Sequence, residues 1–168
     1  MDEKEFAPFV ASLDYPMYVL TVNGGGRLGK AGCLVGFATQ CSISPPKFLV
    51  CLSKQNHTYR AAAETRLAAL HVLAVTDLDL ATLFGTQTGD EVDKFQECAW
   101  TEGPGGVPLL DRCPTWLVGE IEQRTDLGDH EGLLLNPVQV AGDVSLAPLA
   151  FSAVRDLNAG HDASGHDA

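Results

Sequence analysis

Two clusters of polar residues stand at opposite ends of one apolar, strand-like segment, residues 47–53. The first cluster, residues 39–44, supplies hydroxyls, an amide and a thiol directly before Pro45-Pro46. The second is Asn56-His57-Thr58, just after the apolar segment. Hydroxyls, amides and free backbone N–H groups can bind a phosphate or the polar edge of a flat ring. Because a strand of that length spans roughly 20 Å, the two clusters could line an elongated ligand that carries a phosphate.

Both clusters also have simpler structural interpretations. Serine and threonine in a turn often satisfy the backbone of that same turn, and Asn56 or Thr58 could cap a helix that begins there. A helix start carries partial positive charge, so capping and anion binding are compatible. Arg60 in the first turn opposes the helix dipole, and this mildly favours a bound anion nearby.

Two further segments carry residues that could serve a binding site. Gly128-Asp129-His130 is predicted to form a turn between two strands, and its histidine could donate a hydrogen bond or stack on a ring. An ordinary turn histidine remains the alternative. Lys94-Phe95 ends a charged stretch, which also fits a solvated loop anchored by its aromatic residue.

Composition excludes several classes of protein. The net charge of −11 argues against nucleic-acid binding, because binding to phosphate backbones needs concentrated Lys and Arg. No apolar run approaches the roughly 20 residues needed to cross a bilayer, and the acidic N-terminus is unlike a secretory signal. These features predict a cytoplasmic protein with no membrane contact. The five cysteines lack CxxC spacing, which favours buried thiols over disulfides or a zinc site.

The elements that must position these residues are mostly strands. The pattern predicts a single domain over residues 15–157, preceded by an arm at 1–14 and followed by a disordered tail at 158–168. Strands are predicted at residues 17–23, 33–39, 47–53, 67–75, 115–122 and 133–140, and helices at 58–65 and 76–85. Many strands at short spacing with few helices favour a barrel over a parallel sheet.

These motifs, taken in order along the chain, resemble those of the flavin reductase-like family, with the likeness closest to its flavoredoxin-like branch. The resemblance covers most of the stretch from residue 15 to about residue 144. The matching residues are Gly32, Gly36-Phe37-Ala38-Thr39-Gln40-Cys41-Ser42, Pro45-Pro46, Asn56, Thr58, Phe84-Gly85, Asp93-Lys94-Phe95, Gly106, Pro108-Leu109-Leu110 and Gly128-Asp129-His130.

The resemblance implies a mainly β fold with short helices, the Greek-key, FMN-binding split β-barrel, assembled as a homodimer. It also implies an NAD(P)H-dependent flavin reductase, in which hydride passes from NADH or NADPH to N5 of FMN, or of FAD in some members. A partner monooxygenase is one destination for the reduced flavin. The alternatives are a non-catalytic flavin- or heme-binding protein and a deazaflavin- or pyridoxamine phosphate-dependent oxidase-like enzyme of the same architecture.

The resemblance also assigns roles to individual residues. The expected contacts with the isoalloxazine ring and ribityl chain are Thr39, Gln40, Cys41 and Ser42. The flavin phosphate is expected at Asn56 and Thr58, with Ser53 or Lys54 nearby. Lys94 and Phe95 are expected to close the phosphate or ring side, and His130 to lie near the nicotinamide and the reactive face of the flavin.

Overall fold

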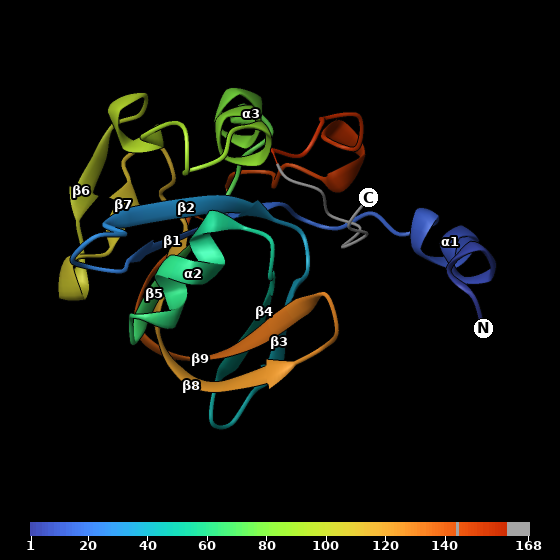
Figure 1. Ribbon diagram of the computed structural model, residues 1–168, viewed down its shortest axis with the longest axis horizontal. Coiled ribbons are helices and arrows are strands. Elements are labelled where there is room, and N and C mark those ends of the chain that lie inside the picture. Colours follow the sequence, from blue (N-terminus) through green and yellow to red (C-terminus); the bar gives the residue numbers. More distant parts are fainter. Residues whose placement is uncertain (144, 161–168) are drawn as a thin grey trace.

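A single antiparallel sheet of seven strands, in the order β2-β1-β5-β8-β9-β4-β3, forms the centre of the fold. The computed structural model describes residues 1–143 and 145–160 (Figure 1). The strands are β1 (Tyr18–Asn23), β2 (Lys30–Val35), β3 (Ala38–Ser42), β4 (Lys47–Ser53), β5 (Leu67–Val72), β6 (Trp100–Glu102), β7 (Pro108–Leu110), β8 (Trp116–Asp126) and β9 (His130–Ala141). The helices are α1 (Glu3–Ala11), α2 (His57–Ala63) and α3 (Leu78–Thr86), with 3-10 turns at Lys94–Gln96, Pro104–Gly106 and Phe151–Ala153.

The sheet curls into a barrel that does not close, because its edge strands β2 and β3 do not pair with each other. In Figure 1 the strands run around a ring, with α2 lying across the opening that faces the viewer. Two alanines of α2, Ala61 and Ala62, are fully buried with the barrel core. The prediction of a mainly β split barrel is therefore confirmed.

The central strands are apolar on both faces because both faces are covered. Along β1, Tyr18, Leu20 and Val22 belong to the core inside the barrel. Val19, on the other face, packs in a second cluster with Phe84 of α3. A strand covered on both sides is apolar at most positions, which explains the nearly continuous apolar run that predicted it.

Most predicted elements are confirmed, with one wrong in its extent. The strand predicted over residues 33–39 is interrupted, because the chain leaves the edge strand β2 and enters the opposite edge strand β3 through Gly36 and Phe37. A Cβ at Gly36 would stand 2.5 Å from the ring of Tyr15, so the chain turns here against an aromatic side chain. The short strands β6 and β7 were not predicted.

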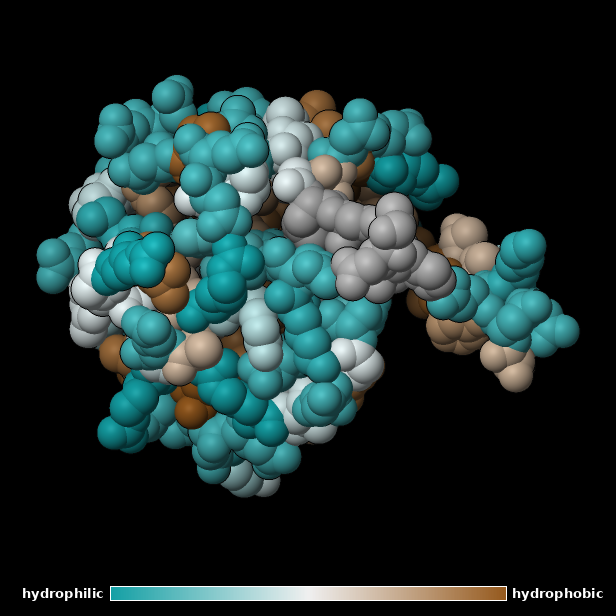
Figure 2. Space-filling model, in the orientation of Figure 1, coloured by the Kyte–Doolittle hydropathy of each residue, from teal (hydrophilic) through white to brown (hydrophobic). Residues whose placement is uncertain are grey.

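The N-terminal arm contains α1, which has no buried residue and projects away from the barrel (Figure 1). Figure 2 shows a mostly hydrophilic surface over the barrel on this side, whereas hydrophobic residues gather on the arm. Of the predicted tail at 158–168, residues 161–168 lie outside the described residues. The N–H of Gly160 donates to the carbonyl of Gly85 at 3.1 Å.

Candidate functional site

A groove of about 980 Å³ lies between α1 and the outer face of β3 and β4. Its floor includes Thr39, Leu49 and Cys51, and Phe37 stands beside them. The side of α1 that faces it is apolar, with Phe6 and Phe9 among its residues. The volume is within the range of small-molecule and cofactor sites, and the apolar walls suit a flat aromatic ring.

The pairing of β3 with β4 decides which predicted side chains reach this groove. Thr39 pairs with Leu49, and Gln40 pairs with Phe48. Because successive side chains of a strand point to opposite faces, Thr39 faces the groove, whereas Gln40 lines a separate cavity on the inner side of β4. Cys41 is exposed at an irregularity in the register between Gln40 and Ser42. The four residues expected to contact the isoalloxazine ring and ribityl chain therefore do not share one face, because Thr39 and Gln40 line different spaces.

His130 lies beside this groove at the first position of β9. It pairs with Ser53 at the end of β4, and its ring lies 5.3 Å from that of Phe37, centroid to centroid. Its Nδ1 is 2.9 Å from Oδ1 of Asp129, and this hydrogen bond lowers the pKa of the Asp129 carboxyl. The structure thus pairs His130 with Ser53, whereas Thr39 lies further along the same sheet, beside Leu49.

The turn after β4 is tied to the turn before β9. The N–H of Lys54 donates to the carbonyl of Asp129 at 3.0 Å. The ammonium of Lys54 donates to Asp126 at 2.8 Å, which raises the pKa of the lysine and lowers that of the aspartate. The side chain of Asp126 is mostly exposed, so this ion pair is weak and solvent-screened. A phosphate bound at this turn would therefore meet the Lys54 ammonium, whose carboxylate partner is the exposed Asp126.

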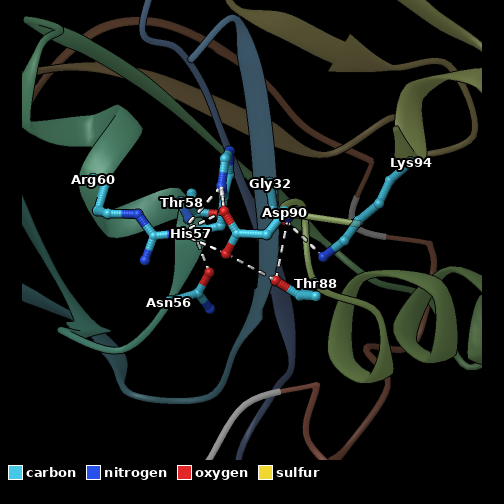
Figure 3. Close-up of polar contacts among 8 residues, drawn as sticks. All are labelled: Gly32, Asn56, His57, Thr58, Arg60, Thr88, Asp90 and Lys94. Carbon is cyan, nitrogen blue, oxygen red and sulfur yellow. Dashed lines mark hydrogen bonds and ion pairs between the residues drawn. The ribbon is translucent and has the colours of Figure 1, made fainter. Parts of the chain in front are cut away.

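Asn56 and Thr58 form the start of α2 (Figure 3). Oδ1 of Asn56 accepts the N–H of Thr58 at 2.9 Å, so Asn56 is the N-cap of the helix. The side chain of Thr58 is buried. Burial raises the pKa of the Cys33 thiol to about 11, and a hydrogen bond with the Thr58 hydroxyl offsets this only in part. The capping interpretation of Asn56 is confirmed.

Lys94 and Phe95 are buried rather than part of a solvated loop. The Lys94 ammonium donates to the carbonyls of Gly32 at 3.0 Å and Phe84 at 3.2 Å, linking β2 to α3. Burial lowers its pKa, and no described hydrogen bond joins it to a carboxylate. Phe95 packs edge-on against Phe84 at 5.8 Å between ring centroids.

Sequence reasoning missed Asp90, which ties the loop before Lys94 to α2 (Figure 3). Its Oδ1 lies 2.8 Å from Nδ1 of His57 and accepts a 2.7 Å hydrogen bond from Arg60. Arg60 first, and His57 second, lower the pKa of Asp90 to about 2. Arg60 therefore already has an anionic partner, and its position in the helix no longer argues for a bound phosphate. Nothing in a spacing of 30 residues between Arg60 and Asp90 signals this contact.

Within residues 1–143 and 145–160, no three His, Cys, Asp or Glu side chains come together as a metal site would require. The helices of the same residues include none with the length and apolar character needed to span a membrane.

Comparison with known proteins adds an independent observation. The family model described as flavin reductase like domain matches residues 10–157. Among curated proteins, the chain is 29% identical over 141 residues to FMN reductase (NADH) RutF 2 of Rhizobium rhizogenes, covering 82% of this chain and 78% of that protein.

Two solved structures share the fold at lower identity. An NADH:FAD oxidoreductase of Streptomyces globisporus superposes with a TM-score of 0.81 at 23% identity, over 90% of this chain and 89% of that one. Nitrilotriacetate monooxygenase component B of Mycobacterium thermoresistibile superposes with a TM-score of 0.76 at 19% identity, over 89% of this chain and 82% of that one. At these identities the structures support the fold.

Proposed function

The chain belongs to the flavin reductase-like family, and from that premise we propose that it is an NAD(P)H:flavin oxidoreductase. It takes hydride from NADH or NADPH and passes it to N5 of FMN, with FAD as the other candidate flavin. The observation that carries this proposal is the apolar groove of about 980 Å³ over β3 and β4, with His130 beside it.

The groove offers what a flavin ring needs from a protein. Phe37 and Leu49 supply apolar surface for the face of the ring. The edge strand β3 has backbone N–H and C=O groups on its outer side that pair with no neighbouring strand, and such groups can bind the polar edge of a ring. We propose that Thr39 contacts the flavin through its side chain. Gln40, Cys41 and Ser42 contribute chiefly through the backbone.

We place the flavin phosphate at the turn between β4 and α2. Ser53 and Lys54 would contact it directly, because the Ser53 hydroxyl lies at the end of the groove face and Lys54 is half-buried with a weakly held charge. Asn56 and the buried Thr58 hold the start of α2 in place beside them. Lys94 and Phe95 act from the core, by fixing β2 against α3.

The flavin supplies the redox chemistry when it is bound, so no side chain need act as a nucleophile or base. The contribution of the protein is to hold two flat rings in contact and to exclude water. His130 serves this purpose by bordering the groove, with its orientation fixed by Asp129. We propose that it positions the nicotinamide.

We propose that the protein is a cytoplasmic homodimer. Five large apolar side chains of the arm are exposed, namely Met1, Phe6, Phe9, Val10 and Leu13. A helix as short as α1 is marginal on its own in water, so a second copy covering the arm and groove would stabilise it. Light scattering on the full chain should give a dimer mass, and a chain lacking residues 1–14 should give a monomer. A full-length monomer at micromolar concentration contradicts the dimer.

The direct test of the function measures nicotinamide oxidation by the purified protein with added FMN or FAD. We expect oxidation that depends on both protein and flavin, and a preference for one nicotinamide. Absence of oxidation with both nicotinamides at saturating flavin would leave only a binding role.

We also propose that the reduced flavin is released to a partner monooxygenase, as the name of the Mycobacterium structure suggests for that protein. Reduction under anaerobic conditions followed by rapid desalting distinguishes the outcomes. Reduced flavin in the small-molecule fraction supports release. Reduced flavin that stays with the protein argues for direct use on a small acceptor.

A further inference from the structure

A second cavity, of about 350 Å³, lies on the inner side of β4, away from the groove. Successive side chains of β4 point to opposite faces of the sheet, and this separates the cavity from the groove: Phe48 lines the cavity, whereas Leu49 lines the groove. Its walls are mainly apolar, with Tyr18 of β1 and Leu70 of β5 on one side and Trp116 of β8 and Val140 of β9 on another.

Tyr18 gives this cavity one hydrogen-bonding group without a protein partner. The residue is only 8% exposed, and its ring packs edge-on against Phe48 at 6.1 Å. Its hydroxyl makes no hydrogen bond to any residue that the structure describes. No fully buried side-chain N or O among those residues lacks a partner, so the hydroxyl must remain accessible from the cavity that Tyr18 lines. A hydroxyl in apolar surroundings gains free energy when a ligand supplies the missing partner.

The charges around the cavity favour a neutral ligand. Among the residues that the structure describes, Lys47 is the one charged residue in its wall, and its ammonium is held by Glu122 and by Oδ1 of Asn136. The amide of Gln40 donates to the carbonyl of Ser42 at 3.1 Å. An anion would have to displace the Glu122 carboxylate from Lys47, and a cation would find no carboxylate in the wall.

We infer that this cavity is a binding site for a small neutral aromatic molecule with one hydrogen-bonding group, of the phenol class. An apolar cavity of about 150 Å³ is enough to bind benzene, so a volume of about 350 Å³ accepts one ring with small substituents. Phe48, Leu70 and Trp116 provide the apolar and aromatic contacts, and the Tyr18 hydroxyl provides the polar one. The site is separate from the proposed flavin groove, so its occupancy can be tested without turnover.

The test uses Trp116 as the reporter, because it lines the cavity and the chain has 2 tryptophans. In a Trp100→Phe background, phenol and toluene are each titrated into the full-length protein while Trp116 emission is followed. We expect a saturable change with both, and tighter binding of phenol. Tyr18→Phe should weaken phenol binding about threefold to tenfold, the range for one hydrogen bond, and leave toluene binding unchanged.

A matched pair of substitutions locates the binding. Ala141 lines the cavity, so Ala141→Leu should abolish the phenol response. Ala63 is exposed at the end of α2, so Ala63→Leu should preserve it.

The inference is overturned if phenol gives no saturable change, or if the two alanine variants behave alike. A third result also overturns it: phenol fails to bind the parent protein, and Ala141→Leu converts a dimer into a monomer. The cavity would then be part of the contact with a second copy of this chain. If Tyr18→Phe does not fold, the comparison of phenol with toluene in the parent protein decides: equal affinities contradict the role of Tyr18.

Discussion

Acidification should destabilise the barrel through one buried histidine, His71 of β5. His71 is fully buried. Its Nε2 accepts the N–H of Leu110 at 3.2 Å, so the ring proton is on Nδ1, which donates to the carbonyl of Val19 at 3.1 Å. Both nitrogens are therefore satisfied in the neutral ring, and burial lowers the pKa of His71 from 6.5 to about 4.

The direction and size of the effect follow from this pKa. Above about pH 6.5 the ring is neutral in the folded and unfolded states, and the full stability is present. As the pH falls toward 4, the unfolded chain takes up a proton that the folded protein does not, so the free energy of unfolding decreases. At about 1.4 kcal/mol for each pH unit between the two pKa values, the loss approaches about 3 kcal/mol, of which about 2.5 kcal/mol has appeared by about pH 4.5.

Urea denaturation near neutral pH and near pH 4.5, in the parent protein and in His71→Asn, measures this contribution. The asparagine side chain can donate to Val19, and it does not titrate. We expect the variant to be less stable at neutral pH because it leaves a cavity, and to lose about 2.5 kcal/mol less on acidification than the parent. Carboxylates such as Asp90, whose pKa is about 2, act at lower pH. If the two proteins lose the same free energy, His71 does not control acid stability.

Three other substitutions test the site and its support. Lys54→Ala should weaken FMN binding by about 1 to 2 kcal/mol and leave riboflavin binding unchanged, because riboflavin lacks the phosphate; equal losses for both flavins would remove Lys54 from the phosphate site. His130→Ala should slow flavin reduction in rapid mixing more than it changes FMN affinity, and an unchanged rate would make His130 a turn residue only. Lys94→Ala should lower the free energy of unfolding by about 2 to 4 kcal/mol, because it leaves a cavity and two carbonyls without their donor; a loss below about 1 kcal/mol in urea denaturation would show that water replaces the ammonium.

The strands were predictable where burial imposes a pattern. The apolar runs of β1 and β5 follow from their covered faces, and in β4 the buried Val50 and Leu52 face the core. The split at Gly36 was not predictable, because the residues on either side have strand character and only the tertiary path separates β2 from β3.

The candidate site was predictable in part. The order of the motifs along the chain pointed to Thr39, Ser53 and His130, which the structure gathers near one groove. The separation of Gln40 from Thr39 follows from the two-residue period of a strand, so the sequence contained that signal. Burial of Lys94 and pairing of Asp90 with Arg60 depend on contacts between distant segments, and no local pattern encodes them.

The central claim is that this groove brings a nicotinamide into contact with a flavin. Anaerobic rapid mixing of the protein and FMN with NADH or NADPH, followed by loss of flavin absorbance, tests it most directly. The account predicts protein-dependent reduction that slows when C4 of the nicotinamide carries deuterium and that slows further in His130→Ala. Reduction at the same rate with and without the protein would contradict it.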